Sequence, residues 1–261
     1  MSNNIVASVT RAGTYEPFEL QVARGQIMGH KTLFKFGING DVGTSIETVW
    51  AQGGTYVYPA SATVMKISSS SADDTSAGTG ARTIAIFGLD ANYNEISESV
   101  ILDGQTAVNT GNSYLRISRM YVTTAGSGAT AAGTIYAGTG TVTSGVPATV
   151  YGMIAINANQ TQMAFWTVPS GYTFYLTGVY YTSGNTNANA WTNFQLIQRP
   201  LGGVFRQQSS SRVAGNGDFV LDLHTPIAFT EKTDIEVRAV ASTSPSNVSA
   251  EFEGIYIKNP D

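Results

Sequence analysis

Apolar and polar residues alternate along most of the chain, and short turn signals interrupt the alternation. The clearest example is residues 82–103, where Ile84 and Ile86 fall on one side of an extended chain. The run from Asp90 to Asn94 interrupts the pattern, and Asp and Asn suit turns because they bond their own backbone and tolerate left-handed conformations. These residues predict a β-hairpin.

Two groups of such strand candidates follow a different N-terminal stretch. The first group covers residues 41–148, and the second covers residues 149–261, with the interruption Ser144-Gly-Val-Pro147 between them. The second group contains eight candidates, the number that a jelly roll needs. Apolar residues nowhere recur at helical spacing through a capped run. The sequence therefore predicts an all-β fold of two antiparallel β-sandwich domains, the second of them jelly-roll-like.

Residues 1–40 read as an extended N-terminal arm. Apolar residues alternate there, and Pro17, Gly25 and Gly29 disfavour a compact helical domain. We expect the apolar residues to cover a neighbouring subunit, since exchanged arms lock oligomers. An edge strand within the chain's own domain is an equally open alternative. The residues predicted to lie at this subunit or partner interface are Phe18, Leu20, Val22, Arg24, Leu33, Phe34 and Phe36.

Composition narrows the function classes. The absence of cysteine excludes disulfide frameworks, thiol catalysis and zinc sites of the cysteine type. The net charge of −4 argues against nucleic acid as a partner, and no apolar run predicts a membrane span or an export signal. Charged residues form only 12% of the chain, so burial against neighbouring subunits requires little desolvation of Lys or Glu.

The arginines are unevenly placed. The window from residue 104 to residue 217 contains no Asp or Glu, yet it holds several arginines. These side chains must face solvent, stack on tyrosines, or meet carboxylates of another segment or subunit. Solvated arginines without a role remain an open alternative. The possible interface arginines are Arg116, Arg119, Arg206 and Arg212.

Two polar stretches, residues 68–80 and 125–133, read as exposed and mobile loops. Asp73 and Asp74 in the first loop are a weak calcium candidate, and a solvated acidic tip is the favoured interpretation. The Asp90 run begins like a calcium loop, but Glu95 stands where that motif requires glycine.

The remaining candidate chemistry gives no catalytic, cofactor or metal site. His30 and His224 each lack a partner at a metal-ligand spacing, so structural roles are favoured. No motif supports a carboxylate pair for glycoside cleavage, such as Glu95 or Glu98 with Asp218. An aromatic run is a candidate sugar platform, although strand alternation places about half of it in the core. Its members are Phe174, Tyr175, Tyr180 and Tyr181.

Three segments carry a family resemblance that covers most of the chain. They are Gly25-Gln-Ile-Met-Gly-His30 with Lys35-Phe-Gly, Gly80-Ala-Arg-Thr-Ile-Ala-Ile-Phe-Gly-Leu-Asp90 with Asn-Glu-Ile-Ser-Glu, and Gln160-Thr-Gln-Met-Ala-Phe-Trp-Thr-Val-Pro-Ser-Gly-Tyr172. These strand and turn patterns resemble virion structural proteins of tailed bacteriophages, notably marine ones. The resemblance implies a particle component and carries no catalytic residues.

The first hypothesis is therefore a non-enzymatic virion protein, a homo-oligomeric capsid decoration or cement subunit that stabilises the head. It implies a trimer or higher oligomer, contact with other virion proteins such as the major capsid protein, no cofactor, and assembly in the host cytoplasm. The alternative is a tail or fibre-associated receptor-binding protein whose second sandwich holds a glycan. A third hypothesis, a glycan-cleaving tail enzyme, lacks a supporting motif.

Overall fold

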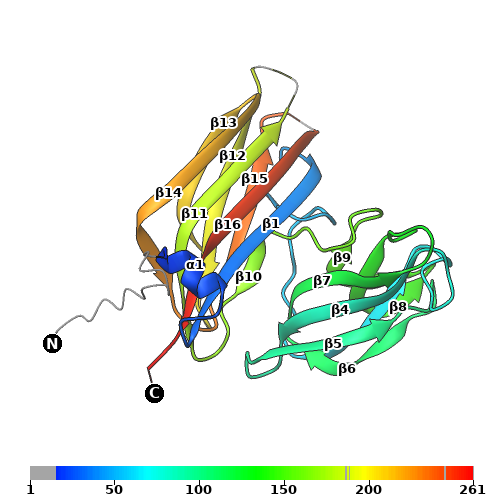
Figure 1. Ribbon diagram of the computed structural model, residues 1–261. Helices are drawn as coiled ribbons and strands as arrows, with labels where there is room; N and C mark the ends of the chain where they lie inside the picture. The colour runs from blue at the N-terminus through cyan, green and yellow to red at the C-terminus, as the bar shows by residue number, and fades with distance from the viewer. Residues whose placement is uncertain (1–15, 186, 188, 244, 261) are drawn as a thin grey trace.

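The computed structural model describes residues 16–185, 187, 189–243 and 245–260, and the first 15 residues of the predicted arm lie outside them. Figure 1 shows two β-sandwiches joined by extended segments. The only helix among the described residues is the short α1 (Phe18–Ala23). The all-β prediction is confirmed.

The larger sandwich is a jelly roll. Its first sheet has the order β1 (His30–Val42), β16 (Ser246–Lys258), β11 (Tyr172–Gly184), β14 (Asn216–Phe229). Its second sheet has the order β10 (Phe165–Thr167), β15 (Asp234–Ala241), β12 (Trp191–Arg199), β13 (Arg206–Ala214), and β2 (Glu47–Thr48) also pairs with β15. If β1 is counted first and β10 to β16 as second to eighth, the orders are 1-8-3-6 and 2-7-4-5, the jelly-roll arrangement.

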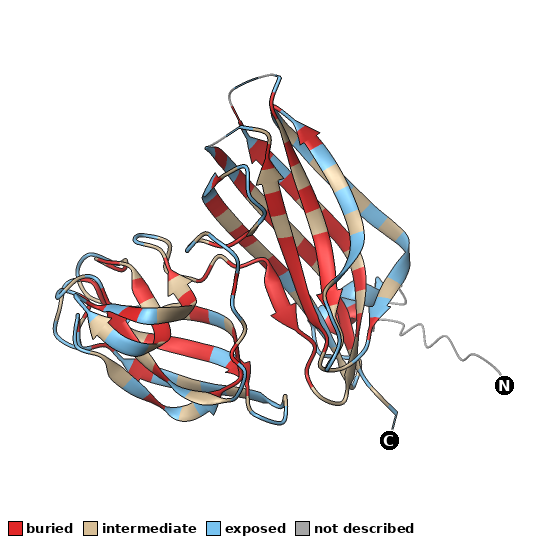
Figure 2. Ribbon diagram, turned by 180° about the vertical axis from the view of Figure 1, so that it is seen from behind, coloured by how far each residue is buried: buried red, intermediate tan, exposed pale blue. Residues whose placement is uncertain are grey.

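Alternate residues of these strands fill one apolar core between the two sheets. Buried and exposed residues alternate along the ribbons in Figure 2, as expected for strands with one face toward the core. Tyr181 on β11 stacks on Phe194 on β12, with ring centroids 4.7 Å apart. Phe174 and Phe252 from the first sheet also lie fully buried in this core. Burial of such rings is the main stabilising term of the sandwich.

The smaller sandwich is inserted between β2 and β10 of the jelly roll. One sheet has the order β6 (Val108–Tyr114), β3 (Thr63–Ser69), β8 (Ile135–Thr143), β9 (Val146–Ile154). The other has the order β5 (Glu95–Ile101), β4 (Ala81–Leu89), β7 (Arg116–Ala125). Its core is built on buried residues of both sheets, among them Met65, Ile67, Ile84, Ile86 and Met120.

The predicted hairpin at residues 82–103 is confirmed as β4 and β5, which pair in antiparallel register with Ile86 opposite Glu98. Asp90 closes the turn, because its carboxylate accepts hydrogen bonds from the backbone amides of Asn92 (2.8 Å) and Asn94 (2.9 Å). Tyr93 has φ 66°, a left-handed conformation that the turn requires. A side chain of the turn itself therefore fixes the conformation of the turn backbone.

The structure places the division between the sandwiches differently from the predicted 148/149 boundary. β9 pairs with β8, so that boundary falls inside a strand of the smaller sandwich. Ser144 (φ 48°) and Gly145 (φ 79°) form the two-residue loop of this hairpin, with Thr143 opposite Val146. The interruption at residue 144 is therefore a hairpin turn within one sandwich.

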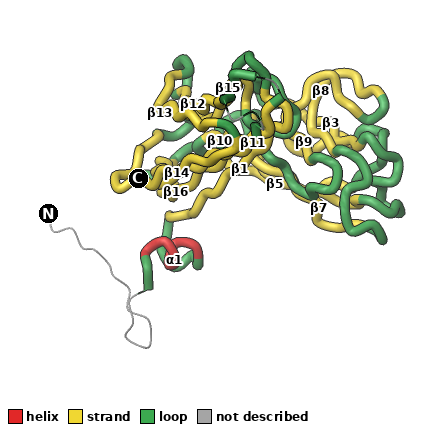
Figure 3. The backbone as a smooth tube through the Cα atoms, turned by 90° about the horizontal axis from the view of Figure 1, so that it is seen from above, coloured by secondary structure: helices red, strands yellow, loops and turns green. Residues whose placement is uncertain are grey.

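The N-terminal segment also differs from the extended arm that the sequence predicts. Residues 18–23 form a helix, which ends because Gly25 adopts φ 67° and its amide bonds to the Val22 carbonyl, while the Gln26 amide bonds to that of Gln21. β1 then pairs along its length with β16 and forms an edge of the jelly roll. Figure 3 shows α1 beside the larger sandwich.

The two loops predicted to be mobile are tied together by one carboxylate. Asp74 is fully buried and accepts hydrogen bonds from the amides of Ala81, Ala132 and Gly133 and from the Ser69 hydroxyl. Four hydrogen bonds satisfy the accepting capacity of a carboxylate. Asp74 is thus a structural residue that joins 68–80 to 125–133, in place of the predicted solvated tip.

Candidate functional site

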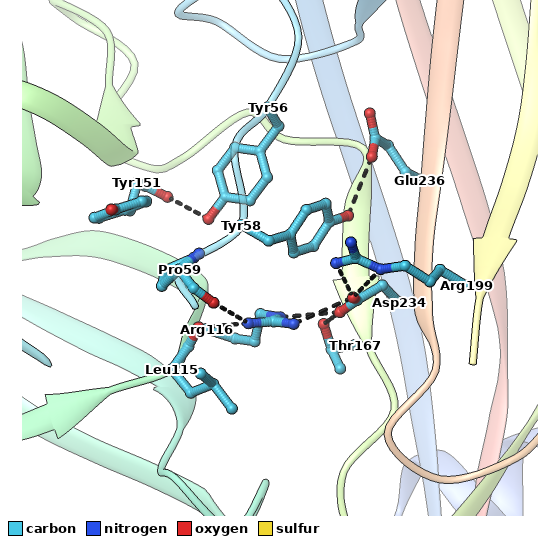
Figure 4. Close-up of polar contacts among 10 residues, drawn as sticks. All are labelled: Tyr56, Tyr58, Pro59, Leu115, Arg116, Tyr151, Thr167, Arg199, Asp234 and Glu236. Carbon is cyan, nitrogen blue, oxygen red and sulfur yellow. Dashed lines mark hydrogen bonds and ion pairs between the residues drawn. The ribbon is translucent and has the colours of Figure 1, made fainter. Parts of the chain in front are cut away.

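The two sandwiches meet at a buried ion-pair network (Figure 4). Arg116 at the start of β7 binds Asp234 on β15 through two hydrogen bonds, from Nε to Oδ1 (2.9 Å) and from Nη2 to Oδ2 (3.2 Å). Arg199 Nη2 also donates to Asp234 Oδ2 at 2.6 Å, and the Thr167 hydroxyl donates to Oδ1 at 2.6 Å. Burial disfavours the charged form of the guanidinium, but the hydrogen bonds and negative charge of Asp234 favour it more strongly. The pKa of Arg116 is therefore raised.

Tyr58 lies between the two guanidinium groups of this network. Its ring centroid is 4.9 Å from the Arg116 guanidinium and 4.7 Å from that of Arg199, and its hydroxyl donates to Glu236 Oε2 at 3.2 Å. Burial and the nearby carboxylates of Glu236 and Asp234 raise the pKa of Tyr58 well above its usual value. Tyr58 therefore stays neutral and serves as a hydrogen-bond donor and a cation-π partner.

An apolar cluster completes the junction beside the ion pairs. Trp50, Tyr56, Met163 and Phe165 are buried together, and the rings of Tyr56 and Phe165 lie with centroids 4.0 Å apart. The Tyr56 hydroxyl donates to the Tyr151 carbonyl of β9 at 3.3 Å. Aromatic packing and paired charges on the same interface hold the sandwiches in one orientation.

A groove of about 520 Å³ separates β1 of the jelly roll from β7 and β4 of the smaller sandwich. Figure 1 shows β1 on the side of the jelly roll that faces the smaller sandwich. Half of the lining residues are aromatic and two are cationic, and no carboxylate is among the described residues that form the groove. The lining residues are Thr32, Leu33, Phe34, Lys35, Phe36, Phe87, Ser118, Arg119, Tyr121, Thr161, Trp166 and Tyr256.

Lys35 is the unusual residue of this groove. It is only 8% exposed, and its ammonium donates a hydrogen bond to the Ser118 carbonyl of β7 (2.6 Å). Burial and the neighbouring charge of Arg119 lower the pKa of Lys35 to about 7. An ammonium carries three donors, so Lys35 retains the capacity to bind an anion in the groove.

The structure separates the four predicted interface arginines. Arg116 is buried against Asp234 of its own chain, so the carboxylate that it meets belongs to another segment of the same chain, one of the alternatives left open by the sequence. Arg119 lies in the groove, stacked 5.5 Å from the Tyr121 ring centroid and bonded to the Gln160 side chain. Arg212 stacks on Trp191 at 4.1 Å, and Arg206 is exposed on β13. The last three remain available to a partner.

The seven predicted arm residues differ in their surroundings. Val22 is buried within the chain and Leu33 packs against the jelly-roll core, so both stabilise their own subunit. Arg24 forms an ion pair with Glu16. The side chains of Phe18, Leu20 and Phe34 are exposed, whereas Phe36 is half-buried with its ring 6.2 Å from that of Phe34.

The other chemical candidates have structural surroundings. His30 packs edge-on against Phe18 and its Nδ1 contacts the Met28 carbonyl, whereas His224 is exposed. In the described part of the chain, no group of three His, Asp or Glu side chains has metal-ligand geometry. No described helix has the length and apolar character needed to cross a membrane.

The carboxylate and aromatic candidates are likewise accounted for by local contacts. Glu95 accepts a hydrogen bond from the Tyr256 hydroxyl at 3.0 Å and forms an ion pair with Lys31. Glu98 accepts hydrogen bonds from the backbone amides of Gly111 and Asn112. Asp218 is exposed on β14 of the other sandwich. Of the aromatic run, Phe174 and Tyr181 are buried in the core, and Tyr175 and Tyr180 are half-buried, in agreement with the expected alternation.

Sequence reasoning missed Lys35 and Asp234. A signal for Lys35 exists in the alternation Leu33, Lys35, Gly37, which places a cation on the inward face of a strand. Asp234 carries no such signal, because the alternation of Ile235 and Val237 puts it on the face of β15 away from the jelly-roll core, where the smaller sandwich buries it. The groups that surround these two charges come from distant segments of the chain. The local sequence pattern does not show which distant segments are in contact.

Neither a protein-family model nor a curated protein matches the chain. Among solved structures, that of the infectious bursal disease virus Gx strain is similar over 89% of this chain and 73% of the other, with 10% identity and a TM-score of 0.26. The VP2 subviral particle of the same virus gives 10% identity, a TM-score of 0.22, and coverage of 89% and 72%. Similarity at this level does not establish a common fold.

Proposed function

We propose that the protein is a non-enzymatic structural component of a virion, a homo-oligomeric capsid decoration or cement subunit. The sequence resemblance to virion structural proteins of tailed bacteriophages points to the particle. The chain's architecture suits the role, because two sandwiches joined by a buried ion-pair network form a rigid block. Jelly rolls serve many functions, so the fold alone does not carry the proposal.

The observation that carries the proposal is the apolar surface of the N-terminal segment. Phe18 (44% exposed), Leu20 (48%), Met28 (95%) and Phe34 (55%) are large apolar side chains on α1, β1 and the turn between them. Clustered exposed apolar residues are typical of interaction surfaces. We assign this surface, named the N-terminal apolar surface, to contacts with a second subunit or with the capsid.

Sedimentation velocity of the purified chain tests the assignment. We expect a trimer or higher oligomer whose association is insensitive to salt, because the contacts are apolar. The double variant Phe18→Asp, Leu20→Asp should sediment as a monomer. The matched control Leu201→Asp, Val204→Asp, which changes two exposed apolar residues elsewhere, should still associate. A native chain that remains monomeric at every concentration, or an equal loss in the control, contradicts the assignment.

Point substitutions test this surface better than a truncation of residues 1–36 does. That truncation would remove more than half of β1, including Leu33, which packs against the core. A loss of association would then follow from damage to the fold alone.

The alternative, a tail-associated glycan-binding protein, has one supporting observation. The Tyr180 hydroxyl lies 3.1 Å from Asp222 and 3.0 Å from Glu253, so an aromatic ring and two carboxylates meet on the outer face of the jelly roll. Rings and carboxylates together suit a sugar with several hydroxyls. Glycan-array binding that is lost in Tyr180→Ala would favour this alternative over the decoration role.

A further inference from the structure

We propose that the groove beside β1 binds an extended, carboxylate-bearing segment of a partner protein by strand addition. The inference concerns a specific partner site and does not depend on whether the protein is a virion component. It rests on a strand edge that no described strand covers, an aromatic lining, and a buried ammonium that has more donors than its one hydrogen bond to the Ser118 carbonyl uses.

One long edge of β1 is not paired with any strand of the described residues. β1 is the terminal strand of its sheet and pairs with β16 on one side. The Lys258 amide donates to the Gly29 carbonyl, and bonded pairs in an antiparallel ladder recur at every second residue. The backbone groups of Leu33 and Lys35 therefore face β16, whereas those of Phe34 face away from it.

These outward backbone groups lie along the groove. Residues 32–36 all line the groove although their side chains alternate between the two faces of the sheet, so the groove runs along the edge of β1. An edge strand with unpaired amides and carbonyls is a template for another extended chain. Strand addition gives affinity through the main chain, and flanking pockets give specificity for alternate side chains.

The walls of the groove provide those pockets. Phe87 and Tyr121 of the smaller sandwich stack with centroids 5.5 Å apart, and Trp166 and Tyr256 of the jelly roll lie with centroids 5.2 Å apart. Aromatic faces on both sides of a strand edge suit the apolar side chains of an added strand.

The positive charge of the groove favours a partner segment that carries a negative charge. Lys35 and Arg119 are the charged residues among the described lining, and both are cationic. A nearly buried lysine beside an arginine is costly unless an anion compensates it. The Ser118 carbonyl uses one of the three donors of Lys35, so a carboxylate of the added strand can accept another.

The carboxylate at the rim of the groove does not serve this purpose. Glu95 of β5 pairs with Lys31 and accepts a hydrogen bond from the Tyr256 hydroxyl, and Lys35 forms no ion pair with any residue that the structure describes. The titratable groups that face Lys35 from the packed elements are Arg119 and Tyr121 of β7 and Tyr256 of β16. An incoming carboxylate therefore meets a net positive site.

Two terminally blocked hexapeptides of alternating threonine and valine provide the probes. One carries a single central aspartate, and its twin carries asparagine at the same position. Binding to the full chain at pH 6 is measured by calorimetry and by the indole NMR signal of Trp166. We expect the aspartate peptide to bind about tenfold more tightly, and the difference to shrink at pH 8.5, where Lys35 is largely neutral.

Three variants separate the components of the proposal. Lys35→Met should abolish the preference for aspartate while weak binding of both peptides remains. Phe34→Pro should abolish binding of both peptides, because proline removes an outward amide that β16 does not use. Phe34→Ala removes the same ring but keeps that amide, so it should bind with the preference for aspartate intact. Circular dichroism and melting temperatures confirm that each variant is folded.

Several results would overturn the proposal. Equal affinity for the two peptides, or binding of neither, removes the charge selection. Equal behaviour of Phe34→Pro and Phe34→Ala removes strand addition, and if Phe34→Pro fails to fold, Thr32→Pro against Thr32→Ala makes the same comparison. Sodium acetate that binds as tightly as the aspartate peptide would indicate a simple carboxylate site without an added strand.

Discussion

Asp234 of the jelly roll holds Arg116 of the smaller sandwich through two hydrogen bonds of 2.9 and 3.2 Å, and both side chains are buried. The two residues are 118 positions apart in the chain, and the whole smaller sandwich is inserted between β2 and β10. This contact makes the insertion and the jelly roll one rigid block. The groove, whose lining comes from both sandwiches, depends on this arrangement.

The first prediction concerns this ion pair. Asp234→Ala leaves Arg116 buried without a carboxylate, and the loss of one partner of a buried pair costs about 3–5 kcal/mol. Urea unfolding should show this loss, whereas Asp222→Ala, on the exposed side of β14, should change the free energy of unfolding by less than about 0.5 kcal/mol. Similar small losses in both variants would mean that the junction contributes little.

The second prediction concerns the β4–β5 hairpin. Ile86 is fully buried, so Ile86→Asp places an unpaired charge in the core and should cost about 3 kcal/mol or more. Asn92 is exposed in the turn, where its backbone amide bonds to Asp90, and Asn92→Ala should cost less than about 1 kcal/mol. Chemical denaturation of both variants tests this. If the turn variant were as damaging as the core variant, the turn would have to bind a ligand or partner.

The third prediction concerns Asp74 and the two loops that it joins. Asp74→Ala breaks four hydrogen bonds and should make residues 68–80 and 125–133 the first sites of limited proteolysis. The native chain should resist cleavage there. Asp73→Ala changes the exposed neighbouring carboxylate and should leave the cleavage pattern unchanged. Rapid cleavage of the native chain at both loops would show that the tie does not restrain them.

The fourth prediction concerns the pH dependence of stability. The folded chain holds the pKa of Lys35 near 7, below the ordinary value of 10.5, so the unfolded chain binds more protons between these values. The free energy of unfolding should therefore rise with pH from about 7 to about 9.5, by at most about 1.4 kcal/mol per pH unit. Denaturation of Lys35→Met should lack this rise. A slope that persists unchanged in that variant would assign it to other groups.

The sequence predicts those features that depend on neighbouring residues. Alternation around Ile86 and the turn chemistry of Asp90 correctly predict the hairpin. Seven of the eight strand candidates in residues 149–261 are strands of the jelly roll, whereas the first belongs to β9 of the smaller sandwich and the first jelly-roll strand is β1. The turn at Ser144 was read as a boundary because a hairpin loop and a linker have similar local signals. The alternation of Phe18, Leu20 and Val22 suggested a strand, but Pro17 and Gly25 bound a short helix there.

Local sequence patterns do not predict features that depend on contacts between distant segments. The first jelly-roll strand lies before the insertion, so no window of the sequence contains the complete fold. Asp74 was read as a solvated tip because its partners, Ala132 and Gly133, lie in another loop. The groove likewise requires β1 and β7 to face each other. Only this arrangement places Lys35 in a groove beside Arg119.

Electron microscopy of purified virus particles, with a gold-marked antibody raised against the purified chain, shows whether the protein is part of the capsid. We expect gold spread regularly over the capsid surface. A matched control uses antibody absorbed beforehand with the purified chain, which should remove the label. Gold confined to the tail or fibres would support the receptor-binding alternative, and particles without label, from a lysate that contains the free protein, would contradict a role in the virion.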